Sequence, residues 1–232
     1  MAIYLDSTDL GDARAAAELG FVEGFTTNPA LLARHGVDPL VRLSELLGVF
    51  GRGPGFYQPM HASAEAAERE AREAALLAPE RVIVKLPART ELFSLAARLA
   101  AEGIRCAITA VYAPAQAMLA HAVRAGWVIP YVDRARRLDP AGEGLVRSLS
   151  AVLRPLGSEP RILAASQKGP EQVAEAIAAG AQDVTVPLDV LERIGDHPLS
   201  EQAVEEFDEA ARRMDGSGSM GRASRSPRPP GA

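Results

Sequence analysis

Short apolar stretches alternate with longer segments of helical periodicity along most of the chain. Each apolar stretch has the length and composition of a β-strand, and each helical segment is long enough to connect two parallel strands. The expected strands are residues 3–6, 21–26, 56–60, 81–87, 104–110, 127–131, 161–166 and 183–187. Eight such repeats in roughly 210 residues predict an α/β fold, a single (β/α)8 TIM barrel with an extra C-terminal helix. A doubly wound parallel sheet is the alternative architecture.

Composition supports one globular domain over residues 1–214, because 47% of the 232 residues are hydrophobic, enough for a large core. Within this range, residues 133–142 are expected to form a polar link before a helix that ends near residue 153. Residues 215–232 contain mainly Gly, Ser, Pro and Arg and have almost nothing to bury. We expect this tail to be disordered.

Several classes of protein are disfavoured by the composition. Residues 1–214 carry a net charge of −7 and show no contiguous basic face, so nucleic acid is not an expected partner. No window approaches the ~18 apolar residues of a membrane helix, and the first residues do not resemble a secretory signal. We therefore expect a cytoplasmic protein without a membrane partner.

Metals and redox cofactors are not expected. The single cysteine, Cys106, cannot form an intramolecular disulfide or a cysteine-based metal cluster. The four histidines share no ligand spacing, and no dinucleotide fingerprint follows a strand.

Lys85 occupies an unusual place near the end of the apolar strand 81–87. A β-branched run closed by a proline indicates a strand buried on both faces, where an ammonium group is poorly solvated. Burial should lower the pKa of Lys85, and a neutral lysine amine can form a Schiff base with a carbonyl group. The alternative is a strand-end lysine whose ammonium group reaches water.

Other polar residues fall at the carboxyl ends of the expected strands, where TIM barrels carry their active groups. They are Asp6, Thr26, Asn28, Gln58, Lys85, Thr109, Tyr131, Arg134, Ser166 and Lys168. Each also has a simpler explanation: the residues before helices could be caps, and the arginine could belong to a solvated charged face. Together, however, an amine, a carboxylate, a phenol and an amide suit the proton transfers of imine chemistry. The late-strand group Arg134, Ser166 and Lys168 could bind the anionic end of a substrate.

The chain resembles the small transaldolase family, and most closely its fructose-6-phosphate aldolase-like branch. The matching segments run in order through the chain: residues 3–6, 26–29, 82–87, 109–112, 130–134, 163–166 and 185–190. The resemblance implies a metal-free class I enzyme, an aldehyde-lyase or transferase, without a cofactor. It also implies a homo-oligomer, a pentamer or decamer assembled with help from C-terminal helices near residues 201–214.

The resemblance assigns a role to each candidate. Lys85 would form the Schiff base, and Asp6 would assist proton transfer and hold the lysine. Gln58 and Thr109 would orient a catalytic water in contact with the acid/base Tyr131. Thr26 and Asn28 would bind substrate, with Asn28 in contact with the donor hydroxyls, and Arg134, Ser166 and Lys168 would bind the phosphate.

Two positions favour the aldolase branch. Transaldolases of the family typically have Glu in place of Gln58 and Phe in place of Tyr131. A phenol can protonate the dihydroxyacetone enamine and release the ketone, whereas phenylalanine cannot. The chain departs from the family pattern at Pro59 and in the segment after Arg134, which contains Arg136 and Arg137.

Three functions follow as hypotheses. The first is a class I aldolase that cleaves or forms the bond between dihydroxyacetone and an aldose phosphate, as in fructose 6-phosphate. The second is a transaldolase that transfers the same three-carbon unit between sugar phosphates. The third, from another class, is a barrel that binds phosphosugars without catalysis. In each case the partner is a small sugar or sugar phosphate.

Overall fold

A computed structural model describes residues 1–61, 63–157 and 160–217. These residues belong to two compact units, one from Met1 to Leu191 and the other from Glu192 onward. The first unit contains the strands and most of the helices, and the candidate site lies within it. The expectation of a single domain over residues 1–214 stays a prediction.

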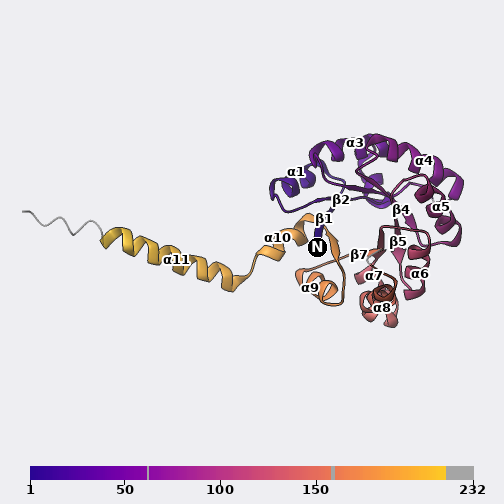
Figure 1. Ribbon diagram of the computed structural model, residues 1–232. Coiled ribbons are helices and arrows are strands. Elements are labelled where there is room, and N and C mark those ends of the chain that lie inside the picture. Colours follow the sequence, from indigo (N-terminus) through magenta and orange to yellow (C-terminus); the bar gives the residue numbers. More distant parts are fainter. Residues whose placement is uncertain (62, 158–159, 218–232) are drawn as a thin grey trace, which may run out of the picture. The chain divides into compact units, whose positions relative to one another are not determined.

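Eight parallel strands form a closed barrel in sequence order, and β8 pairs with β1 (Figure 1). The strands are β1 (Ala2–Asp6), β2 (Gly24–Thr26), β3 (Gly55–Tyr57), β4 (Val82–Pro87), β5 (Cys106–Val111), β6 (Trp127–Pro130), β7 (Arg161–Ala164) and β8 (Asp183–Val186). The predicted (β/α)8 TIM barrel is confirmed, and the alternative of a doubly wound sheet is wrong, because an open sheet has no β8–β1 pairing.

Helices follow each of the strands along the chain. They are α1 (Leu10–Glu18), α2 (Pro29–Leu32), α3 (Pro39–Val49), α4 (Ala64–Leu77), α5 (Thr90–Ala101), α6 (Pro114–Ala122), α7 (Val132–Leu138), α8 (Leu145–Leu153), α9 (Pro170–Ala178), α10 (Leu188–Gly195) and α11 (Pro198–Ser217). Three 3-10 helices add η1 (Ala33–His35), η2 (Pro140–Gly144) and η3 (Arg154–Leu156). None of the helices in the described residues is both long and apolar enough to cross a membrane.

The strand alternation determines which side chains face the inside of the barrel. In β4, Val84 and Leu86 pack in the outer core against the helices, whereas Ile83 packs in the inner core with Phe56 and Ala107. Successive side chains of a strand point to opposite faces, so Lys85 shares the inward face with Ile83. The sequence Val-Ile-Val-Lys therefore places one amine inside the barrel at the carboxyl end of β4.

The segment after β6 differs from the prediction. Residues 133–142 were expected to form a polar link, but Val132–Leu138 is the helix α7 and η2 follows it. Asp133 lies in the first turn of α7, and Arg136 and Arg137 lie in the last turn. Negative charge at the start and positive charge at the end of a helix interact favourably with the helix dipole and stabilise the helix. A helix of seven residues is too short to show clear periodicity in the sequence.

The C-terminal helix α11 continues to Ser217, so residues 215–217 are helical rather than part of the expected tail. The remaining tail, residues 218–232, lies outside the described residues. Leu199, Phe207 and Met214 on α11 are exposed apolar side chains. The expected homo-oligomer stays a prediction.

Candidate active site

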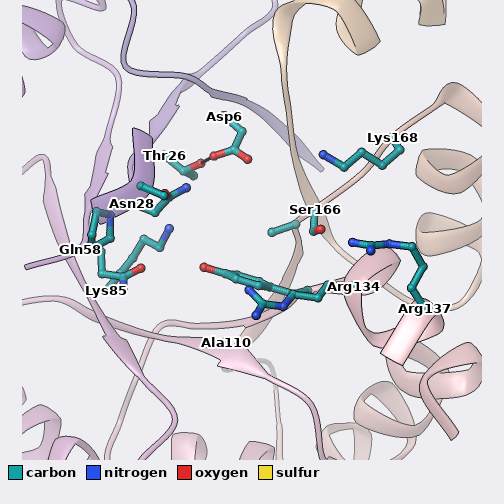
Figure 2. Close-up of a pocket in the computed structure, with 14 residues that line it drawn as sticks. Asp6, Thr26, Asn28, Gln58, Lys85, Ala110, Arg134, Arg137, Ser166 and Lys168 are labelled. Atoms are coloured by element: carbon teal, nitrogen blue, oxygen red, sulfur yellow. Dashed lines mark hydrogen bonds between the residues drawn. The ribbon is translucent and has the colours of Figure 1, made fainter. Parts of the chain in front are cut away.

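A cavity of about 550 Å³ lies at the carboxyl ends of the strands (Figure 2). Nine of the ten predicted site residues line it: Asp6, Thr26, Asn28, Gln58, Lys85, Tyr131, Arg134, Ser166 and Lys168. The tenth, Thr109, is fully buried and contacts the cavity-lining Tyr131. The structure therefore brings together the residues that the strand-end rule selected.

Lys85 is the buried cation of the site, with only 3% of its surface exposed. Its Nζ donates a hydrogen bond to the Thr27 carbonyl oxygen at 2.7 Å. Burial lowers the pKa of the Lys85 amine to about 8, although the negative charge of Asp6 opposes this shift. The alternative of a strand-end lysine reaching water is therefore wrong. Roughly a tenth of this amine is therefore neutral at pH 7 and can attack a carbonyl group.

Asp6 ends β1 and lies opposite Thr26 in the β1–β2 ladder. The Thr26 hydroxyl donates to Asp6 Oδ1 at 3.1 Å and also contacts the Thr185 hydroxyl at 2.7 Å. Burial raises the pKa of Asp6, and the positive charge of Lys85 partly opposes that rise. Asp6 and Lys85 are thus electrostatically coupled, and each favours the charged form of the other.

Thr109 and Tyr131 form a hydroxyl pair on neighbouring elements. Thr109 Oγ1 lies 3.5 Å from Tyr131 Oη, and the rings of Tyr131 and Tyr112 meet edge to face with centroids 6.1 Å apart. Burial raises the pKa of the Tyr131 phenol, so it keeps its proton at neutral pH and can act as a donor. The residue after Thr109, Ala110, has a φ of 54° at a bulge in β5 and lines the cavity.

Gln58 follows β3 and brings an amide to the cavity. Its Oε1 is buried without a hydrogen-bond partner among the described residues. Glu70 on α4 anchors the segment around it, because its carboxylate accepts hydrogen bonds from the Tyr57 hydroxyl and the Met60 amide at 2.5 and 3.0 Å. A buried and unpartnered oxygen is costly unless something binds it, so Gln58 is suited to hold a water or a substrate hydroxyl.

Asn28 is both a helix cap and a residue that lines the cavity. Its side chain caps α2 by accepting a hydrogen bond from the Leu31 amide at 3.0 Å, and it also lines the cavity. The proline that follows, Pro29, occupies the first turn of α2, where its missing N–H is not needed. The cap fixes the position of the amide that faces the cavity.

Two cationic side chains, Arg134 and Lys168, line the cavity together with Ser166. Arg134 projects from α7, and Ser166 and Lys168 lie on the segment after β7 (Figure 2). Ser166 has a φ of 65°, a conformation that is uncommon for a residue other than glycine. Lys168 and Arg134 are exposed, so they can bind an anion without first losing a buried partner.

Arg137 is the cavity-lining cation that the sequence analysis missed. It was expected only in the polar link, and its direction depends on the first residue of α7.

No group of three or more His, Cys, Asp or Glu side chains that could hold a metal ion occurs in the described part of the chain.

The barrel thus holds a buried amine together with a carboxylate and a phenol at the carboxyl ends of its strands. Comparison with known proteins gives the family: residues 58–220 match the model of Transaldolase/Fructose-6-phosphate aldolase. The chain belongs to this family of Schiff-base enzymes. The suggestion of a non-catalytic barrel is therefore set aside.

Relatives of similar length support the assignment. A protein of Symbiobacterium thermophilum named "Probable transaldolase" is 34% identical over 207 residues, covering 89% of this chain and 95% of the relative. A protein of the same name from Roseiflexus castenholzii is 36% identical over 208 residues, which cover 89% of this chain and 95% of that relative.

Among solved structures, a mandelate oxidase variant superposes with a TM-score of 0.59 at 15% identity. The match covers 82% of this chain and 65% of that one. A likeness at this identity shows the shared barrel fold alone.

Proposed function

We propose that the chain is a class I aldolase that cleaves a ketose phosphate such as fructose 6-phosphate into dihydroxyacetone and an aldose phosphate, and forms it in reverse. The observation that carries the proposal is the buried Lys85 amine, which shares its cavity with Asp6 and with the phenol of Tyr131. The amine supplies the nucleophile, and the phenol supplies the proton that an aldolase needs after cleavage.

The first half of the reaction forms the imine. The neutral Lys85 amine attacks the C2 ketone, and the carbinolamine loses its hydroxyl group as water to give a protonated imine. The negative charge of Asp6 stabilises the positive charge of this imine. A water bound between Gln58, Thr109 and Tyr131 carries protons to and from the reacting oxygens.

The second half breaks the carbon–carbon bond. Loss of the C4 hydroxyl proton to this water breaks the C3–C4 bond, the aldose phosphate leaves as an aldehyde, and the bonding electrons pass into a dihydroxyacetone enamine. Tyr131 returns a proton to C3 through the water, and hydrolysis of the imine then releases dihydroxyacetone and free Lys85. The donor hydroxyls lie against Thr26 and Asn28, and the phosphate lies against Arg134, Ser166 and Lys168.

The second candidate is transaldolase, and the names of the relatives favour it. In that reaction the enamine is not protonated but waits for an acceptor aldehyde. The residue that separates the two is Tyr131, because a phenol can deliver the proton that releases free ketone.

Incubation of the enzyme with fructose 6-phosphate alone tests the proposal. We expect dihydroxyacetone and glyceraldehyde 3-phosphate to accumulate together through many turnovers. Release of at most one equivalent of glyceraldehyde 3-phosphate per active site without free dihydroxyacetone, with sustained turnover only after an acceptor aldehyde is added, would establish the transaldolase.

A further inference from the structure

Arg137 lies one helical turn after Arg134, so both side chains project from the same face of α7. Both line the cavity, and Figure 2 shows the Arg137 guanidinium directed toward Ser166. Arg136, between them in sequence, projects elsewhere and forms ion pairs with Glu143 and Glu175 at 3.6 and 2.8 Å. Two of the three arginines of α7 therefore line the cavity, whereas Arg136 pairs with glutamates outside it.

A buried carboxylate holds Arg137 in this orientation. Asp133, which is 8% exposed, accepts a hydrogen bond from Arg137 Nε at 2.9 Å. The other Asp133 oxygen accepts from Gln172 Nε2 at 3.3 Å, and Gln172 Oε1 accepts from the Lys168 amide at 2.8 Å. This chain of contacts connects the helix that carries the arginines to the segment that carries Lys168.

The contact through Nε leaves the far edge of the guanidinium available. The Arg137 side chain is 62% exposed, whereas the Asp133 side chain is only 12% exposed. Asp133 contacts this guanidinium through Nε, and Figure 2 shows the guanidinium directed toward Ser166. Arg134, Arg137 and Lys168 line the same cavity as Ser166 and bring three positive charges to it.

We infer that Arg137 is a specificity-determining residue that completes a three-cation site and makes the enzyme select substrates whose terminal group is a dianion. A phosphate monoester near neutral pH carries more charge and more acceptor oxygens than a carboxylate, so it gains more from a third cation. The guanidinium fork, oriented by Asp133, can donate two parallel hydrogen bonds to one phosphate. The inference rests on the proposed function for the identity of the substrate, but the binding of a dianion can be tested without catalysis.

The first test is a binding measurement that does not involve Lys85 chemistry. Calorimetric titration with glycerol 3-phosphate, which has no carbonyl group and cannot form an imine, compares wild type, Arg137→Gln and the matched control Arg136→Gln. We expect the Kd to rise about tenfold for Arg137→Gln and by less than about twofold for Arg136→Gln, the scale of one charge-assisted hydrogen-bond pair. Glycerate, with a carboxylate in place of the phosphate, should bind wild type more weakly and lose less on substitution.

A second test measures the aldol reaction of dihydroxyacetone with glyceraldehyde 3-phosphate and with glyceraldehyde. The ratio of the two kcat/KM values should fall about tenfold in Arg137→Gln, mainly through the KM for the phosphorylated acceptor. Equal Kd values for glycerol 3-phosphate in wild type and Arg137→Gln would overturn the inference, as would an equal loss with both acceptors. Failure of the proposed function looks different: wild type would bind glycerol 3-phosphate but would not catalyse the aldol reaction.

Discussion

The lowered pKa of Lys85 makes a quantitative prediction for the pH dependence of imine formation. Only the neutral amine attacks a ketone, so the rate should follow the fraction of Lys85 that has lost its proton. With a pKa of about 8, roughly a tenth of the amine is neutral at pH 7. With the ordinary value of 10.5, the neutral fraction would be about 300-fold smaller. Burial thus accounts for about two and a half powers of ten in the rate of attack at neutral pH.

The assay is the initial rate of reductive trapping with subsaturating dihydroxyacetone and cyanoborohydride, followed by mass spectrometry from pH 6 to pH 10. We expect the trapping rate to rise with pH and to level off above a midpoint near 8. A midpoint near 10.5, the value of an exposed lysine, would refute the reasoning.

Replacing Asp6 by asparagine tests the sign of the electrostatic coupling. The Asp6 charge favours the ammonium form and raises the pKa of Lys85, so its removal should move the midpoint to lower pH. The plateau rate is a separate quantity, because Asp6→Asn also removes a group that assists proton transfer. A midpoint that moves upward would contradict the assigned coupling.

Three further predictions concern single substitutions. Lys85→Met should reduce turnover below detection while the circular dichroism spectrum stays that of wild type; appreciable turnover would count against an amine nucleophile. Tyr131→Phe should lower cleavage of fructose 6-phosphate about a hundredfold and transfer much less, whereas the neighbouring Tyr112→Phe should leave both rates near wild type. An equal loss of cleavage and transfer in Tyr131→Phe would remove the reason for preferring the aldolase. Asp183→Leu should lower the free energy of unfolding by about 3 kcal/mol in urea titrations, because this fully buried carboxylate accepts hydrogen bonds from the Ala2 amide, Trp127 Nε1 and the Arg161 guanidinium; a change below about 1 kcal/mol would contradict that role.

Much of the fold could be predicted because its signal repeats. Short apolar strands alternate with helices, and each boundary carries caps, glycines or prolines. The inward direction of Lys85 follows from the alternation in β4, since Val84 and Leu86 occupy the outer core. Because parallel strands end at the same side of a barrel, the sequence is enough to assign residues scattered from Asp6 to Lys168 to one cavity.

The parts that could not be predicted depend on short elements and on side-chain direction. The helix α7 has seven residues, and which of its arginines faces the cavity depends on where it begins. Arg136 and Arg137 are adjacent in sequence and chemically identical, yet one pairs with surface glutamates and the other lines the cavity. The positive φ of Ala110 is equally invisible in the sequence, because alanine gives no sign of a left-handed conformation.

The central claim is that Lys85 forms an imine with the substrate ketone. Peptide mapping after borohydride reduction in the presence of dihydroxyacetone tests it most directly. The account predicts one adduct per chain, of the mass of a reduced dihydroxyacetone imine, on the peptide that contains Lys85 and absent from Lys85→Met. An adduct on another lysine, such as Lys168, or turnover without any trapped adduct, would contradict it.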